Sequence, residues 1–168
     1  MTETINRNFL EIKSIDALIE GKSPKLNYSI DLVNPPDFLV NKFFYKIVGK
    51  KHKWTDRLIW SDTEWTKYVS NPNVKTYILK VENDPAGYFE LIIHKEIQEI
   101  EIAYFGILEE YHSKKLGGCL LSEAIKKSFL ENKIKRIWVH TCTLDHKNAL
   151  NNYLARGMNV YKKEIIKI

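Results

Sequence analysis

Cysteine, glycine and long apolar runs are all scarce in this sequence of 168 residues. The two cysteines, Cys119 and Cys142, are too few for a disulfide framework, and their spacing does not match a CxxC metal-binding motif. No window holds the roughly 20 apolar residues that a membrane-spanning helix needs. Residues 1–10 also lack the apolar core of a secretory signal. We therefore expect a cytoplasmic protein without a membrane partner.

Arginine is scarce as well, although the chain carries a net charge of +5. Only four of the 26 basic residues are arginine, the side chain that contacts guanine and phosphate through two parallel hydrogen bonds. The surplus of lysine is typical of a solvated surface, so we expect no nucleic-acid partner. The alternative, a lysine surface that binds DNA or RNA, predicts an affinity that falls steeply with salt.

The apolar pattern predicts a mixed α/β fold. Residues 8–13 favour an extended segment, and residues 14–20 favour one or two helical turns. The pattern predicts a turn at 83–85, strands over 26–33, 74–81, 87–94, 97–108, 136–142 and 159–168, and helices over 37–48, from Ser61, over 117–131 and over 146–156. This order predicts a mostly antiparallel central sheet with helices on both faces. Whether the last strand pairs within the chain or with a second copy, in a homodimer, stays open.

A polar loop rich in lysine and glycine follows the apolar run 102–108 and leads directly into the helix predicted from Gly117. Unpaired amides at a helix start carry partial positive charge. Glycines allow a phosphate to approach these amides closely, and Lys114 and Lys115 add full charges. The loop therefore predicts a site for a pyrophosphate-bearing cofactor. A plain tight turn is the alternative, and neither a Walker A loop nor a GxGxxG fingerprint is present.

Several stretches between Gly87 and Tyr161 resemble the GNAT N-acetyltransferase superfamily in their order and spacing. They are 87–91 (GYFEL), 101–107 (EIAYFGI), 112–118 (HSKKLGG), 136–139 (RIWV), 148–150 (NAL) and 153–158 (YLARGM). The resemblance implies an acyl-CoA N-acyltransferase fold over residues 26–168, with residues 1–25 as an N-terminal extension. It also implies that the partners are acetyl-CoA, as cosubstrate, and an unidentified amine.

The resemblance implies that acetyl-CoA lies in a V-shaped gap between two central strands. The pantetheine arm would bind backbone amides of the fourth strand of the family, which fall on Phe105, Gly106 and Ile107.

The pyrophosphate would bind the loop in which the family has the pattern Q/R-x-x-G-x-G/A. Here His112 takes the first position, Lys115 replaces the first glycine, and Gly117 matches the last position. A positive φ at Lys115 would cost about 1 kcal/mol, whereas a negative φ would let its amide contact the pyrophosphate without that cost. The residues expected at the pyrophosphate are His112, Lys114, Lys115, Leu116, Gly117 and Gly118.

Acetyl transfer to an amine needs a group that takes a proton from the ammonium and a group that protonates the departing thiolate. Glu101 lies at the start of the strand expected beside the cofactor, where the resembled family often places a general base. A solvated glutamate at a strand end is the alternative. Glu90, on the neighbouring strand, is the reserve candidate and is expected at the substrate.

Tyr153 precedes Gly157 by four residues and matches the tyrosine that many members of the resembled family use as general acid. A phenol with a pKa near 10 is protonated at neutral pH and can still donate its proton. A core tyrosine that packs on Ala149 is the alternative. The family has an asparagine at the start of this helix, where this chain has His146. Asn148 is the expected substitute at the cofactor.

The acceptor side is predicted only in outline. The segment 38–68 is rich in aromatic residues, and Trp54 and Trp60 are expected to line a cleft that would suit a cationic amine. The histidines lack metal-binding spacing, so no metal is expected. The sequence thus predicts an acetyl-CoA-dependent N-acetyltransferase that acts by direct transfer, with Glu101 as base and Tyr153 as acid. The alternative is a non-catalytic acyl-CoA-binding or regulatory module with a degenerate pyrophosphate loop.

Overall fold

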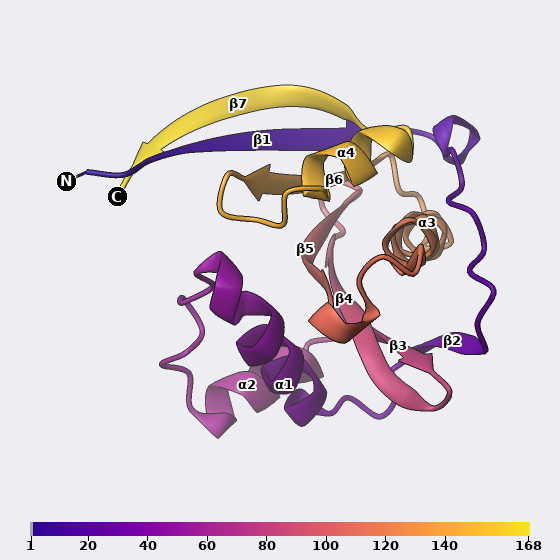
Figure 1. Ribbon diagram of the computed structural model, residues 1–168, viewed down its shortest axis with the longest axis vertical. Coiled ribbons are helices and arrows are strands. Elements are labelled where there is room, and N and C mark those ends of the chain that lie inside the picture. Colours follow the sequence, from indigo (N-terminus) through magenta and orange to yellow (C-terminus); the bar gives the residue numbers. More distant parts are fainter. Residues whose placement is uncertain (1) are drawn as a thin grey trace.

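The computed structural model describes residues 2–168, which form a seven-stranded sheet in the order β2-β3-β4-β5-β6-β1-β7 (Figure 1). All neighbouring strands pair antiparallel except β5 and β6. The strands are β1 (Thr4–Ile12), β2 (Tyr28–Leu32), β3 (Val74–Val81), β4 (Asp84–His94), β5 (Glu99–Ile107), β6 (Arg136–Cys142) and β7 (Asn159–Lys167). The helices are α1 (Phe38–Gly49), α2 (Asp62–Ser70), α3 (Leu116–Phe129) and α4 (Ala149–Ala155), with short 3-10 turns η1 (Ile15–Ala17), η2 (Lys50–His52) and η3 (Glu109–Tyr111). The predicted mixed, mostly antiparallel α/β fold is confirmed.

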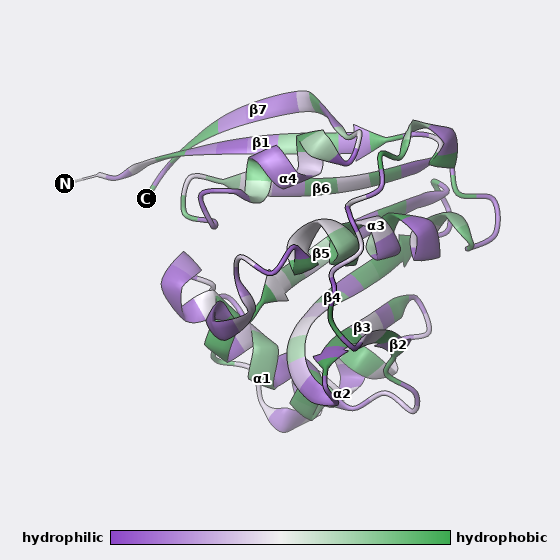
Figure 2. Cartoon of the chain, turned by 45° about the vertical axis from the view of Figure 1, so that its right-hand side comes forward, coloured by the Kyte–Doolittle hydropathy of each residue, from purple (hydrophilic) through white to green (hydrophobic). Residues whose placement is uncertain are grey.

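Helices cover both faces of the sheet: α1 and α2 lie on one face, and α3 and α4 lie on the other (Figure 1). The main core lies between α3 and the middle strands, where Leu120, Ile125 and Ile100 are fully buried. Figure 2 shows that β4, near the middle of the sheet, is mostly hydrophobic, whereas the edge strand β7 is mostly hydrophilic. Burial of apolar area against α3 therefore holds the central strands together.

Polar caps define the starts of α1 and α2. The Asp37 carboxylate accepts a hydrogen bond from the Leu39 amide at 3.0 Å, and the Ser61 hydroxyl accepts one from the Glu64 amide at 3.2 Å. These bonds satisfy amides that have no partner within their own helix. The helix that the sequence predicts from Ser61 therefore begins as expected.

The strand β1 comes from residues 1–25, which the sequence predicts as an extension, and it lies inside the sheet between β6 and β7. Its apolar residues do not alternate simply, because the strand is buried on both faces. Leu10 and Ile12 are buried in the main core, whereas Ile5 is buried beside the cleft described below. The sequence-based division at residue 26 therefore does not coincide with a structural boundary in the sheet.

The turn between β3 and β4 lies one residue before the predicted 83–85. Glu82 and Asn83 have positive φ values of 50° and 68°, and Asp84 already pairs with Val81. Two central residues with positive φ form the tight turn that matches the twist of a β-hairpin. Pro85 therefore lies at the beginning of β4 instead of in the turn.

The strands β5 and β6 separate after a short parallel ladder. Residues 99–101 pair with residues 136–138, and no pairing continues beyond them in the described chain. Further along, β5 stays paired with β4 across a register shift at Ala103, while β6 stays paired with β1. A V-shaped opening results in the middle of the sheet. Within residues 2–168, no helix is long and apolar enough to cross a membrane.

Candidate active site

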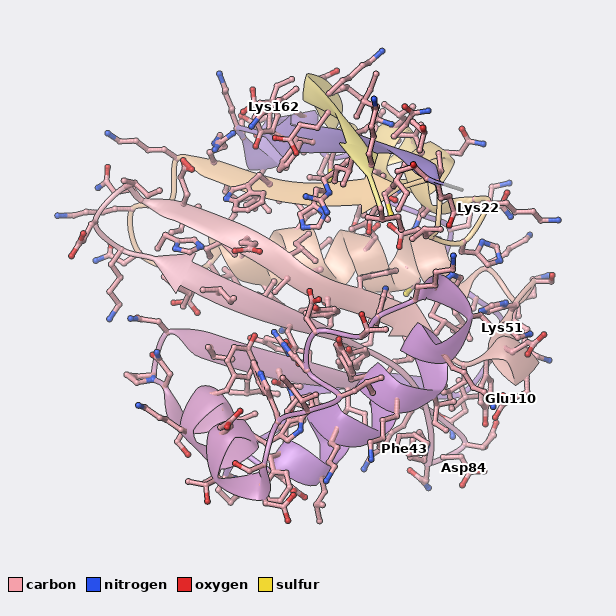
Figure 3. All side chains as sticks on the ribbon, turned by 90° about the vertical axis from the view of Figure 1, so that its left-hand side faces the viewer. Lys22, Phe43, Lys51, Asp84, Glu110 and Lys162 are labelled. Carbon is pink, nitrogen blue, oxygen red and sulfur yellow. The ribbon has the colours of Figure 1, made fainter. Side chains whose placement is uncertain are left out.

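A cleft of about 1200 Å³ opens where β5 and β6 separate. It is lined by β5, β6 and β1, by the start of α3, by α4, and by the segment that follows α1. In Figure 3, the ribbon of α3 is seen between the ribbons of β5 and β6, with Lys162 on β7 above them and Phe43 on α1 below. Because the lining includes residues of α3 and α4 on one face of the sheet and of the segment after α1 on the other, the cleft reaches both faces.

Backbone groups of β5 border the cleft on one side. Phe105, Gly106 and Ile107 pair with β4 through one edge of the strand, while their other edge has lost its partner β6. All three residues line the cleft. Gly106 also permits close packing, because a Cβ at this position would overlap the side chain of Val48 on α1. The unpaired edge of β5 thus offers backbone groups to an extended ligand, except the Ile107 carbonyl, which accepts a hydrogen bond from His112 Nε2 at 2.9 Å.

The loop before α3 presents the start of that helix to the cleft. In the described chain no side chain caps the helix start, so its first amides are free to bind an anion. Gly117 lines the cleft, and a Cβ built there would meet no atom closer than 3.6 Å. The Gly117 carbonyl accepts a hydrogen bond from Asn152 of α4 at 3.1 Å, which fixes the loop against α4. This free helix start fits the pyrophosphate of a CoA molecule.

The backbone conformation of Lys115 distinguishes between the positive and the negative φ considered for this residue. Its φ is +62°, so this lysine lies in the left-handed region that glycine favours. Ser113, two residues earlier, has a φ of +65°. The loop therefore turns at Lys115 as it would with glycine, at a cost of about 1–2 kcal/mol.

The other residues predicted at the pyrophosphate lie in different surroundings. His112, Leu116 and Gly118 line the cleft, whereas Lys114 is exposed and is not among its lining residues. Leu116 is almost completely buried at 1% exposure. Asn148 also lines the cleft, immediately before α4.

Tyr153 lies on α4 and lines the cleft opposite β5. Its side chain is 7% exposed, and its ring packs edge-on against Phe105 with centroids 6.4 Å apart. Burial, and to a smaller extent the negative charge of Asp145, raises the pKa of the Tyr153 phenol well above its ordinary value. The phenol is therefore protonated at neutral pH, as a proton donor requires.

Glu101 lies in the last parallel pair of the β5–β6 ladder, opposite Trp138, and lines the cleft at the point where it opens. Its carboxylate is 3.2 Å from His94 Nε2, and its side chain is 20% exposed. His140 lies nearby on β6. Burial lowers the pKa of His140, and Arg7 lowers it further, while Glu101 opposes this shift. A partly exposed carboxylate and a neutral imidazole thus face this end of the cleft.

Glu90, the reserve candidate, is fully buried and engaged by its neighbours. Arg57 donates to both of its carboxylate oxygens, at 2.9 and 3.2 Å. Asn41 donates to it at 2.7 Å and the Tyr68 hydroxyl at 2.8 Å. Glu90 does not line the cleft. Its acceptor sites are used inside the protein, so it is placed as a structural anchor instead of a substrate contact.

Arg57 anchors the loop between α1 and α2, for which the sequence indicated no anchor. Its guanidinium lies 4.2 Å from the ring centroid of Tyr68, 4.3 Å from that of Tyr104 and 4.8 Å from that of Trp60. Cation–π contacts in a desolvated site add to the ion pair with Glu90. Aromatic residues of this segment, which suggested a site for a cationic ligand, therefore surround the side chain of Arg57 instead.

The two tryptophans predicted at the acceptor have different positions. Trp54 lines the cleft and packs against Tyr104, with ring centroids 4.8 Å apart. Trp60 packs against Trp65 at 4.9 Å and is not among the residues that line the cleft. Arg7 also lines the cleft, although the sequence analysis did not single it out. It lies there because β1 pairs with β6.

A comparison with known families identifies this architecture. The family model described as "Acetyltransferase (GNAT) family" matches residues 39–158, which is more than half of the chain. The chain belongs to the GNAT acetyltransferase family. Among curated protein sequences, none matches it significantly.

Solved structures agree on the fold. A GCN5-related N-acetyltransferase from Sphaerobacter thermophilus superposes with a TM-score of 0.75 at 10% identity, over 99% of this chain and 52% of the other. A GNAT acetyltransferase from Streptococcus pneumoniae gives 0.63 at 19% identity, over 81% and 87%. An aminoglycoside acetyltransferase from an uncultured soil metagenomic sample gives 0.63 at 12%, over 77% and 86%. The chain spans only 52–61% of the length of the first three solved structures that it matches.

Proposed function

We propose that the protein is an acetyl-CoA-dependent N-acetyltransferase that transfers the acetyl group directly to a primary amine of a small molecule or a protein. The observation that carries this proposal is the cleft itself. One continuous opening joins a free helix start, the unpaired edge of β5, the buried Tyr153 phenol and the Glu101 carboxylate. Acetyl-CoA would supply the activated acyl group as a thioester.

The chain's own residues provide the two proton transfers that this reaction needs. Tyr153 holds its proton at neutral pH and would give it to the departing thiolate. Glu101, where the cleft opens, would accept a proton from the ammonium of the acceptor, directly or through a water molecule. The amides of Gly117 and Gly118 would bind the diphosphate at the start of α3, where the helix dipole favours negative charge.

Calorimetric titration with acetyl-CoA, with free CoA and ADP as controls, tests the cofactor part of this proposal. We expect binding that depends on the pantetheine arm, because the unpaired edge of β5 lies beside that arm. Acetylation of a panel of primary amines then tests turnover. Absence of binding at millimolar acetyl-CoA would refute the proposal.

Two substitutions separate the catalytic roles from binding. Tyr153→Phe keeps the ring and removes only the donor, so we expect turnover to fall by about 10²–10⁴-fold with the acetyl-CoA Kd unchanged. Glu101→Gln keeps the size of the side chain and removes the base, so it is expected to lower turnover. Tyr161→Phe, on the edge strand β7, is the matched control and should leave both parameters unchanged.

The alternative function, a non-catalytic acyl-CoA-binding or regulatory module, has one observation in its favour. The loop has His112 and Lys115 where the resembled family has Gln or Arg and glycine. Because Lys115 still adopts the left-handed turn, the loop keeps its shape, and the enzyme is the better supported function. Tight acetyl-CoA binding without turnover on any amine would favour the module.

A further inference from the structure

Three imidazoles from three separate segments meet at the cleft. His146, between β6 and α4, packs edge-on against His112 of the loop before α3, with ring centroids 4.9 Å apart. On its other side it packs against His52 of η2, with centroids 6.5 Å apart. All three histidines line the cleft. The set His52, His112 and His146 is called the imidazole cluster below.

The hydrogen bonds of the cluster determine where protons can be added. His52 Nδ1 lies 3.0 Å from the carbonyl oxygen of Leu144, so this nitrogen must carry a proton and donate it. His112 Nε2 lies 2.9 Å from the carbonyl oxygen of Ile107 and donates in the same way. In their neutral forms, Nε2 of His52 and Nδ1 of His112 are therefore unprotonated. Each can accept a proton without breaking these bonds.

His146 is held differently. Its Nδ1 accepts a hydrogen bond from the Asn148 amide at 3.1 Å, so a proton on Nδ1 would break that bond. Burial lowers the pKa of His146, and the neighbouring His112 and His52 lower it further. His146 is thus kept neutral between the other two imidazoles of the cluster.

The charged groups around the cluster indicate what kind of ligand it faces. Lys115 lines the same cleft and Lys147 adjoins His146, whereas Lys53, which also lines the cleft, is paired with Glu3 at 2.9 Å. Of the acids nearby, Glu109, beside His112, binds Lys51 at 2.6 Å. Asp145 accepts from two neutral groups, the Thr141 hydroxyl at 2.6 Å and the Cys142 amide at 3.0 Å, and Asp56 lines the same cleft. Figure 3 shows Lys51, one partner of the ion pair with Glu109, on the same side of the molecule as Glu110, which adjoins Glu109.

A metal ion does not fit these surroundings. In the part of the chain that the structure covers, no group of three or more His, Cys, Asp or Glu side chains is placed to hold one. Lys115 and Lys147 at the cluster favour an anion and are opposed by the acids Asp56 and Asp145. The free amides at the start of α3 follow His112 by only a few residues, so an anion bound there lies near the cluster.

We propose that His52 and His112 take up protons when the diphosphate of CoA binds at the start of α3, so that the protein binds the cofactor more tightly as the pH falls through neutrality. This inference rests on the proposed function, because it takes CoA as the ligand. The physical cause is the attraction between the diphosphate and an imidazolium, which stabilises the protonated form of each ring in the complex. Each proton taken up offsets one negative charge of the bound diphosphate.

Dephospho-CoA is the probe that isolates this effect. The 3′-phosphate of CoA is a monoester that itself titrates near pH 6, whereas the diphosphate of dephospho-CoA has no group that titrates in this range. We would titrate the protein with dephospho-CoA by calorimetry at about pH 6, 7 and 8, in phosphate-free buffers of different ionisation enthalpy. The dependence of the heat on the buffer gives the number of protons taken up. We expect uptake of about half a proton or more near pH 7 and binding about tenfold tighter at pH 6 than at pH 8.

Variants assign the protons to their residues. His52→Asn places an amide donor near the position of Nδ1, and His112→Gln places one near Nε2, so each keeps its bond to a backbone carbonyl but cannot titrate. The double variant is expected to bind with little proton uptake and with a Kd nearly independent of pH. His94→Gln is the matched control, because His94 does not line the cleft, and it should keep the wild-type uptake.

The outcomes distinguish this inference from the proposed function. If wild-type protein binds without proton uptake, or if the double variant takes up as many protons as wild type, the inference is wrong and the proposed function stands. If neither dephospho-CoA nor acetyl-CoA binds at any pH, the proposed function fails and the inference fails with it. Proton uptake that disappears in the double variant supports the inference.

Discussion

Replacing Lys115 with glycine should stabilise the protein. Lys115 adopts a φ of +62°, which costs a residue with a Cβ about 1–2 kcal/mol. Glycine removes that cost, but it gives the unfolded chain more freedom, which offsets about 0.4–1 kcal/mol. The net gain is about 0.5–1 kcal/mol. For a chain of 168 residues this raises Tm by about 1.5–3 °C, since 1 kcal/mol corresponds to about 2–4 °C at this size.

The control for this prediction is Lys115→Ala, which removes the same charge but keeps a Cβ. Comparing the two variants by thermal and urea unfolding therefore isolates the backbone conformation from the loss of a lysine. We expect Lys115→Gly to be more stable than Lys115→Ala, with both losing some affinity for an anionic ligand. Equal stability of the two variants would refute the assignment of strain to this residue.

Three further predictions concern the stability of the folded protein. Glu90→Leu should cost about 3–5 kcal/mol in urea unfolding, because it leaves Arg57 buried without its acid, and Arg57→Met in the same chain should restore part of this loss. A double variant that is less stable than the single one would contradict this. Gly157→Ala should cost about 1–3 kcal/mol, because Gly157 has a φ of +98° and a Cβ there would overlap the carbonyl oxygen of Ala17; a loss within about 0.5 kcal/mol would argue against it. The lowered pKa of His140 means that, as the pH falls below about 6.5, the unfolded chain binds a proton before the folded one. Stability measured between pH 7 and 5 should therefore fall by at most about 1.4 kcal/mol per pH unit from this group, and His140→Gln should make the fall shallower.

Local patterns were sufficient to predict most elements of the fold. The helices at α1, α2 and α3 and the strands β3 to β6 follow from apolar spacing and from caps such as Ser61, because these signals lie within a few residues of the element itself. The position of β1 in the sheet could not be predicted from such local patterns. It depends on pairing with β6 and β7, more than a hundred residues away, and neither partner leaves a signal in residues 4–12.

Several residues expected at the candidate site, among them Trp54, Glu101 and Tyr153, line the cleft. The glycine loop and the unpaired edge of β5 correspond to sequence stretches that resemble a known family, and both lie at the cleft. The surroundings of the acidic residues could not be read in the same way. Glu90 and Glu101 look alike in the sequence, yet Arg57 neutralises the first and the opening of the sheet exposes the second. That difference arises from a loop and a strand separation that only the assembled fold contains.

The position of β1 has a consequence for how the protein folds. Its pairs with β7 join the first and last strands of the chain, such as Thr4 with Lys167. Contacts of such long sequence separation form late, since closing a long loop costs entropy before any contact compensates for it. During synthesis β1 can therefore pair with β6 and β7 only after residues 136–167 have been made, while β2 to β5 can already pair with their neighbours. The wall of the cleft that carries Arg7 and His140 therefore needs residues that are made after β2 to β5, so the binding site of a newly made chain is completed later than the sheet beside it.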